Sequence, residues 1–221
     1  KGVFYMIEIK NLYLNYIKEY YALYNINLVV EDKQKIAIVG NLESGKTTLL
    51  RAICGLEAYS KGEIYLNKTN LKNIDFKKDI ELIYLSANPV FFNNKTVHHN
   101  LSYPLKVRGF SEELINKKIN RALNNLGIEG LKEEKIKNLS ENEKSIVNIA
   151  RSLLRDADIY LIDDIFKFDE ITNKKIAKVF QENFNPDASI IYALNSTNQN
   201  LIENLQVSKT YTLTNGSLSN Y

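Results

Sequence analysis

The stretch KIAIVGNLESGKTTLLRAI, residues 35–53, joins an apolar run to a helical pattern through the motif GxxxxGKT. The four residues 36–39 are all apolar and predict a buried strand, and Leu49, Leu50 and Ile53 follow at helical spacing. Between a strand and a helix, GxxxxGKT is typical of a phosphate-binding loop. We therefore predict nucleotide binding here; the competing interpretation is a strand-to-helix turn that binds nothing.

The positions of this loop have separate chemical roles. Gly40 and Gly45 let the backbone wrap a phosphate chain, and a helix that begins near Lys46 offers the positive end of its dipole. Lys46 is expected to reach the β- and γ-phosphates, and the Thr47 hydroxyl to hold Mg²⁺. The predicted nucleotide contacts are Gly40, Asn41, Leu42, Glu43, Ser44, Gly45, Lys46, Thr47 and Thr48.

Composition narrows the function classes. The chain has 221 residues, 44% of them apolar and 10% aromatic, which is typical of a globular protein. Its net charge of +3 comes from 29 basic and 26 acidic residues without a basic block, which argues against nucleic acid as a partner. No apolar run approaches the roughly 20 residues of a membrane helix. The single Cys54 is expected to pack as a small apolar side chain, and one cysteine fits a reducing cytoplasm.

The beginning of the chain carries no pattern of a signal peptide. KGVFY before Met6 lacks an apolar segment of the required length, so we expect a cytoplasmic protein. Met6 is a candidate native start, with the first five residues a remnant or a short extension.

Strands and helices are expected to alternate along the chain. Residues 6–14 alternate apolar and polar side chains as an edge or half-exposed strand does, whereas residues 86–109, with Pro89 and Pro104, are predicted to be mostly loop. Further strands are expected at 26–30, 36–39, after the turn at 61–62, at 81–85, 159–162 and 189–194, with a hairpin at 210–219. Helices are expected at 46–53, 111–127, from 140 toward 156, and near 172–180. This order predicts an α/β fold with a mainly parallel sheet covered on both faces and interrupted by a helical insert.

A second motif lies in LSENEKSIVNIARSLLRDADIYLIDDIFKFD, residues 139–169. Asp163 ends an apolar strand and is placed to hold Mg²⁺, usually through water, while Asp164 can orient or polarise an attacking water. The competing interpretation, a turn or helix cap, is disfavoured by the phosphate loop elsewhere in the chain.

This run resembles the motifs of the ATP-binding-cassette (ABC) family in order and spacing, with one residue fewer before Asp169. The fragments that carry the resemblance are LS, IARSL, IYLIDD and FD. In that family LSGGQ opens a helix ending in IARAL, followed by a strand ending in Asp-Glu and by a loop Asp. Together with the phosphate loop, the resemblance covers essentially the whole chain. It implies a P-loop NTPase (RecA-like) fold with a mainly parallel core sheet, an antiparallel β subdomain and a helical insert. One domain would span residues 1–221, with the core at about 1–86 and 155–221 and the helical subdomain at about 87–154.

The resemblance also implies cofactors and partners. ATP and Mg²⁺ would bind to a cytoplasmic subunit that couples them to a membrane-embedded permease at the inner face of the cell membrane. Two such domains would pair head to tail, as a homodimer or a heterodimer, with Ser140 of one contacting the nucleotide of the other. YPLKVRG, residues 103–109, weakly resembles stand-alone importer subunits.

For several aromatic residues and histidines the sequence leaves more than one role open. By spacing, Tyr16 is the counterpart of the family's adenine-stacking residue, and Tyr20 is the alternative. Phe91 and Phe92 either contact the permease or pack locally. His98 and His99 have no companion ligands at metal spacing and are predicted to lie on a loop surface.

Several positions depart from the family pattern. Glu43 replaces a glycine, and Ser86 or Ala87 replaces a Gln that reaches Mg²⁺ and the attacking water; Ser86 is the candidate ligand. LSGGQ has become LSENE, in which Ser140 and Glu143 also satisfy a capping box, a sufficient reason for the serine.

The catalytic positions differ as well. Asp164 replaces the catalytic Glu and draws the carboxylate back by roughly 1.5 Å, and Asn195 replaces the γ-phosphate-sensing His. Lys46, Asp164 and Asn195 are the predicted catalytic residues, and Thr47, Asp163 and Ser86 the predicted metal ligands. Two functions follow: a slow ABC ATPase, or a nucleotide-binding, nearly non-hydrolysing subunit. The LS to IARSL to IYLIDD run disfavours a nucleotide kinase.

Overall fold

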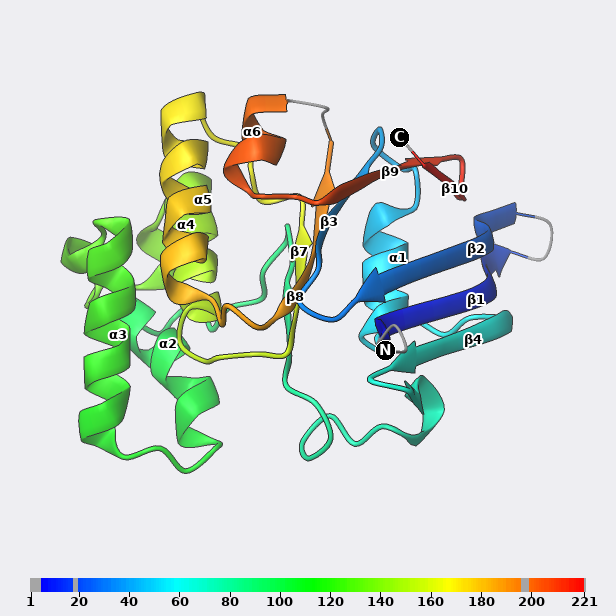
Figure 1. Cartoon of the computed structure of the whole chain (residues 1–221). Coiled ribbons are helices and arrows are strands. Elements are labelled where there is room, and N and C mark those ends of the chain that lie inside the picture. Colours follow the sequence, from blue (N-terminus) through cyan, green and yellow to red (C-terminus); the bar gives the residue numbers. More distant parts are fainter. Residues whose placement is uncertain (1–4, 18–19, 196–198, 221) are drawn as a thin grey trace. The chain divides into compact units, whose positions relative to one another are not determined.

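The computed structural model describes residues 5–17, 20–195 and 199–220 (Figure 1). It divides into two compact units. Unit 1 consists of Lys1–Tyr84, Ala157–Phe166 and Asn185–Tyr221, and unit 2 of Leu85–Asp156 and Lys167–Phe184.

A six-stranded sheet forms the centre of unit 1. Its order is β10-β9-β3-β8-β7-β6, with β3 parallel to β8 and β9, β7 parallel to β8, and β10 antiparallel to β9. Every residue of β7 and β8 is buried, which explains their continuous apolar runs. The strands are β3 (Lys35–Val39), β6 (Leu82–Leu85), β7 (Ile159–Asp163), β8 (Ser189–Leu194), β9 (Lys209–Thr214) and β10 (Ser217–Asn220), and they confirm the strands and hairpin predicted there.

A four-stranded antiparallel sheet completes unit 1, in the order β2-β1-β4-β5. β1 (Tyr5–Ile17) lies between β2 (Tyr20–Glu31) and β4 (Lys61–Leu66), with β5 (Thr69–Asn70) outermost. The edge position considered for residues 6–14 is therefore wrong; the strand is half-buried and interior. β1 and β2 also run longer than predicted, because they pair up to Ile17 and Tyr20.

Helix α1 (Lys46–Ile53) begins directly after the phosphate loop, as predicted. Leu49, Leu50 and Ile53 are fully buried in one apolar cluster with residues of β1, β2 and β3. Cys54 is also buried, and burial raises the pKa of its thiol to about 11, in keeping with a packing role. The remaining elements of unit 1 are η1 (Leu71–Asn73) and α6 (Gln199–Asn204).

Unit 2 is helical, drawn in green and yellow in Figure 1. The helix predicted at 111–127 is confirmed as α3, and Ser111 caps it by accepting a hydrogen bond from the Leu114 N–H. The helix predicted from Ser140 toward Asp156 ends earlier, at Ser152. The elements are α2 (Val97–Lys106), α3 (Glu112–Leu126), η2 (Glu129–Leu131), η3 (Ile136–Asn138), α4 (Glu141–Ser152) and α5 (Glu170–Asn183).

Helix α2 corrects the prediction that residues 86–109 are mostly loop. Val97, Leu101 and Leu105 lie four residues apart on one fully buried stripe, and Thr96 caps the helix. Pro104 stands near the carboxyl end, where burial of this stripe outweighs the lost backbone hydrogen bond.

His98 and His99 therefore lie on a helix, not on a loop surface, and both are half-buried. His98 Nε2 is 2.9 Å from Asn116 Oδ1. The His99 ring packs edge-on against Phe92, whose ring also contacts Tyr103. Phe92 thus packs locally while half of its surface stays exposed.

Two side chains of α4 hold the loop that follows β6. Asn148 Nδ2 donates to the Ser86 carbonyl at 2.8 Å, and Arg151 Nη1 donates to the Val90 carbonyl at 3.0 Å. Arg151 Nη2 also donates to Asn148 Oδ1, and its guanidinium lies over the Phe91 ring. Loop 86–91 is consequently fixed to α4.

The amino end of α4 carries the capping box that the sequence allows. Glu143 Oε2 accepts from both the Ser140 N–H and the Ser140 hydroxyl, and the Glu143 N–H donates back to Ser140 Oγ. These bonds hold the pKa of the Glu143 carboxyl below its ordinary value.

Replacing Ser140 by alanine should lower the free energy of unfolding by about 1 kcal/mol, because the orphan N–H groups lose their cap. Ser145→Ala in the same helix is the control: its hydroxyl only bonds back to the Glu141 carbonyl, so the change should be neutral or stabilising. Urea unfolding monitored by circular dichroism measures both. Equal effects of the two variants would contradict the capping role.

Candidate functional site

The loop at residues 40–47 has a backbone that only glycine accommodates at two points. Gly45 has φ 105°, and a Cβ there would lie 2.6 Å from the Ala22 carbonyl oxygen. A Cβ on Gly40 would lie 2.6 Å from Ser44 Oγ. The same Cβ would lie 2.3 Å from the Leu213 carbonyl oxygen on β9. The loop is thus packed tightly against β2 and β9, and its curvature is fixed by close approach.

Lys46 lies at the centre of this loop and is only 6% exposed. Its Nζ donates to the carbonyls of Gly40 and Asn41 at 2.6 and 2.8 Å, and to Ser44 Oγ at 3.3 Å. Burial lowers the pKa of the ammonium, and the Asp164 and Asp163 carboxylates act in the opposite direction. The result is a partly desolvated cation inside a ring of main-chain atoms.

Asp163 ends β7 and is 1% exposed. Thr47 Oγ1 donates to its Oδ1 at 3.0 Å, and the Tyr84 hydroxyl donates to its Oδ2 at 2.8 Å. Burial raises the pKa of Asp163, while these two hydrogen bonds lower it. The structure therefore brings together Thr47 and Asp163, the two predicted metal ligands of unit 1. It also shows Tyr84 as a second hydrogen-bond donor to Asp163.

Asp164 and Asn195 contact each other. Asn195 Nδ2 donates a short hydrogen bond to Asp164 Oδ2. Asp164 has φ 47°, a conformation that Asp and Asn tolerate better than most residues, and its N–H donates to the Ala193 carbonyl at 3.0 Å. The amide of Asn195 is thus directed to a carboxylate.

Tyr16 lies close to the amino end of α1. Its hydroxyl is 3.2 Å from Thr48 Oγ1, and 58% of the residue is exposed. Tyr20, the alternative, is also exposed. Asn41, Leu42 and Glu43 are exposed at the rim of the loop, and Glu43 has φ 63°.

Ser86 and Ser140 belong to unit 2, so their predicted contacts with metal and nucleotide stay predictions. Ser86 Oγ accepts from the Asn88 N–H at 3.2 Å. The Ser140 hydroxyl serves the capping box.

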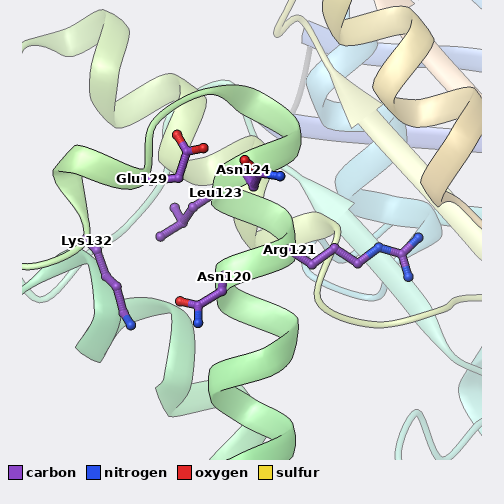
Figure 2. Close-up of a pocket in the computed structure, with 6 residues that line it drawn as sticks. All are labelled: Asn120, Arg121, Leu123, Asn124, Glu129 and Lys132. Atoms are coloured by element: carbon purple, nitrogen blue, oxygen red, sulfur yellow. The ribbon is translucent and has the colours of Figure 1, made fainter.

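Unit 2 also has a surface pocket of about 540 Å³ beside α3 and η2 (Figure 2). The picture shows Asn120 and Lys132 extending along its wall, whereas Arg121 points away from them. Arg121 Nη2 donates to Asn183 Oδ1 at 3.3 Å. The polar groups do not converge on one point, and none is a predicted site residue. The lining is Asn120, Arg121, Leu123, Asn124, Glu129 and Lys132.

Comparison with known proteins assigns the family. The model of the ABC transporter family matches residues 23–167, about two thirds of the chain. The chain belongs to the ABC transporter family. The resemblance read from the LS to IYLIDD run is thereby confirmed at the level of the family.

Individual relatives of this ABC domain agree. It is 33% identical over 183 residues to the methionine import ATP-binding protein MetN of Clostridium acetobutylicum, covering 80% of this chain and 56% of the relative. The chain spans about half the length of the curated relatives it matches.

Solved structures show the fold. A dimeric ATP-binding cassette in a post-hydrolysis state, bound to ADP and Pi, superposes with a TM-score of 0.85 at 23% identity, covering 97% of this chain and 98% of that one. The cbiO1 protein of Clostridium perfringens, part of the ABC transporter complex cbiONQ, gives 0.77 at 22% identity, with coverages of 98% and 87%. The predicted fold class is confirmed: a P-loop type domain with a parallel core sheet and an antiparallel subdomain.

The residues of the ABC domain fit a magnesium nucleotide. A carboxylate beside a hydroxyl suits a hard cation, and the glycine-shaped loop around Lys46 suits an anion. Bound Mg²⁺ would neutralise phosphate charge.

Among the described residues no helix is long and apolar enough to cross a membrane.

Sequence reasoning missed two features of this site. Tyr84 approaches Asp163 from a position 79 residues away, and no motif marks it. The pairing of Asn195 with Asp164 was also missed, although both had been singled out.

Proposed function

We propose that this chain is the ATP-binding subunit of an ABC transporter. It binds MgATP at residues 40–48, with Lys46 on the phosphates and Thr47 and Asp163 toward the metal. The observation that carries the proposal is the contact of Thr47 Oγ1 with Asp163 Oδ1 at 3.0 Å next to the buried Lys46. This arrangement supports the proposal because the Lys46 ammonium can bind phosphate and the Thr47 and Asp163 oxygens can bind Mg²⁺.

The same proposal includes slow hydrolysis. Asp164 orients the attacking water; it is half-buried and directly follows Asp163, the last residue of β7. A base displaced by about 1 Å from its best position can reduce the rate on the order of 100-fold. We therefore expect a working but slow ATPase.

The second candidate is a subunit that binds the nucleotide and hardly hydrolyses it. The specific observation in its favour is the hydrogen bond from Asn195 to Asp164, which commits the amide that would sense the γ-phosphate. In this case the chain acts as a structural or regulatory half of an assembly.

The partners belong to the proposal as well. Relatives are named import ATP-binding proteins, and cbiO1 is part of a complex, which supports pairing with a membrane-embedded permease at the inner face of the cell membrane. The dimeric cassette supports pairing with a second ABC domain, identical or different. The subdomain division at about 87 and 154 and the adenine contact of Tyr16 are part of the same proposal.

Adding ADP with Mg²⁺ should raise the melting temperature of the full chain. At 100 times the dissociation constant the stabilisation is about 2.7 kcal/mol, roughly 5–10 °C for a chain of this size. Differential scanning fluorimetry measures the shift, and AMP, which lacks the β-phosphate that Lys46 would hold, is the control. Identical curves with and without MgADP would contradict nucleotide binding.

A further inference from the structure

The hydroxyl of Tyr84 provides the second hydrogen bond to the buried carboxylate of Asp163. Tyr84 lies on β6, the strand next to β7 in the sheet, and its hydroxyl donates to Asp163 Oδ2 at 2.8 Å. Thr47 donates to the other oxygen, Oδ1. One donor on each oxygen fixes the plane of the carboxylate.

The position of the Tyr84 hydroxyl is itself fixed. The ring is partly buried and packs against the apolar cluster of unit 1, as Leu82 does two residues earlier on the same strand. Because the sheet holds the backbone and the cluster holds the ring, the hydroxyl cannot follow a carboxylate that rotates. It sets the orientation of Asp163 rather than adapting to it.

We propose that Tyr84 is a positioning residue for magnesium binding, acting through the carboxylate of Asp163. This inference rests on the proposed function, since it concerns the same metal. Hydrogen bonds to a metal-binding carboxylate orient it, and removing such a partner typically reduces metal affinity on the order of 10–100-fold. Asp163 is 1% exposed, so bulk water does not replace the lost donor.

The variant Tyr84→Phe removes only the hydroxyl and keeps the ring. The measurement is the Mg²⁺ concentration that gives half of the additional thermal stabilisation at saturating ADP, compared with the stabilisation by ADP in EDTA. We expect this Mg²⁺ midpoint to rise on the order of 10-fold. The shift by ADP without metal should stay as in the wild type, because Lys46 and the loop are untouched.

Tyr160→Phe is the matched control. Tyr160 is a fully buried tyrosine on the adjacent β7, and its hydroxyl accepts from the Ala157 N–H at 3.1 Å, a structural contact. This variant should lower the melting temperature without ligands and leave the Mg²⁺ midpoint unchanged.

The outcomes separate the two proposals. A wild-type Mg²⁺ midpoint in Tyr84→Phe overturns the positioning role while leaving nucleotide binding in place. Loss of the metal-free ADP shift in Tyr84→Phe also overturns it, since the hydroxyl would then shape the loop. Absence of any stabilisation of the wild type by ADP, with or without Mg²⁺, overturns the proposed function and this inference together.

Discussion

Lys46→Ala should reduce the thermal stabilisation by MgADP by about half or more at ligand concentrations near 100 times the wild-type dissociation constant. The Lys46 ammonium is the cation inside the loop, and in the proposed function it binds the phosphates. A hydrogen bond to a charged group contributes about 1.5–3 kcal/mol, so loss of this phosphate contact weakens binding roughly 10- to 100-fold. Isothermal titration calorimetry with ADP gives the affinities directly.

The matched control for this change is Lys35→Ala. Lys35 lies on the strand that leads into the loop, and burial lowers the pKa of its ammonium as it does for Lys46. Its Nζ donates to Gln206 instead of to loop carbonyls. Lys35→Ala should bind ADP as the wild type does, and an equal loss in both variants would mean that general destabilisation, not the phosphate contact, is measured.

Asp164→Asn should reduce steady-state phosphate release to the level of a blank while leaving nucleotide binding intact. Asn is nearly isosteric and tolerates the positive φ of this position, so the change removes the charge and keeps the backbone. Loss of a well-placed general base typically reduces a rate about 10²- to 10⁴-fold. A coupled phosphate assay at saturating MgATP measures the rate.

Two comparisons make this result specific. Asp187→Asn, at an exposed carboxylate paired with Lys33, should keep the wild-type rate. Asp164→Glu should remain active, because the carboxylate is retained on a longer side chain. A wild-type rate already at background, combined with normal ADP binding, would support the non-hydrolysing candidate.

The predictable parts of the fold are those whose signal is local. Glycine spacing and apolar runs fixed the order of strand, loop and helix at residues 35–53, and Ser111 with its following acidic residues marked the start of α3. Helix α2 was missed because Pro104 and the polar residues around it outweighed the four-residue spacing of Val97, Leu101 and Leu105. That stripe becomes decisive only when a neighbouring surface buries it.

The residues of the candidate site also differ in whether a local sequence signal predicts them. Lys46, Thr47 and Asp163 follow from motifs, because the chemistry restricts residue type at fixed spacing. The contact of Tyr84 with Asp163 and that of Asn195 with Asp164 depend on which strands are neighbours in the sheet. Neighbouring strands here are distant in sequence, so no single-sequence pattern records them.

The bonds from Lys46 to the carbonyls of Gly40 and Asn41 have a consequence for how this protein can change. The chain's own atoms shape the loop, so its form is acquired during folding and little ordering is left for the ligand to impose. Asp164 and Asn195 are more exposed and hydrogen-bond to each other. In the proposed function, nucleotide binding and hydrolysis are therefore expected to be separable: substitutions that stop hydrolysis can leave a protein that still binds nucleotide.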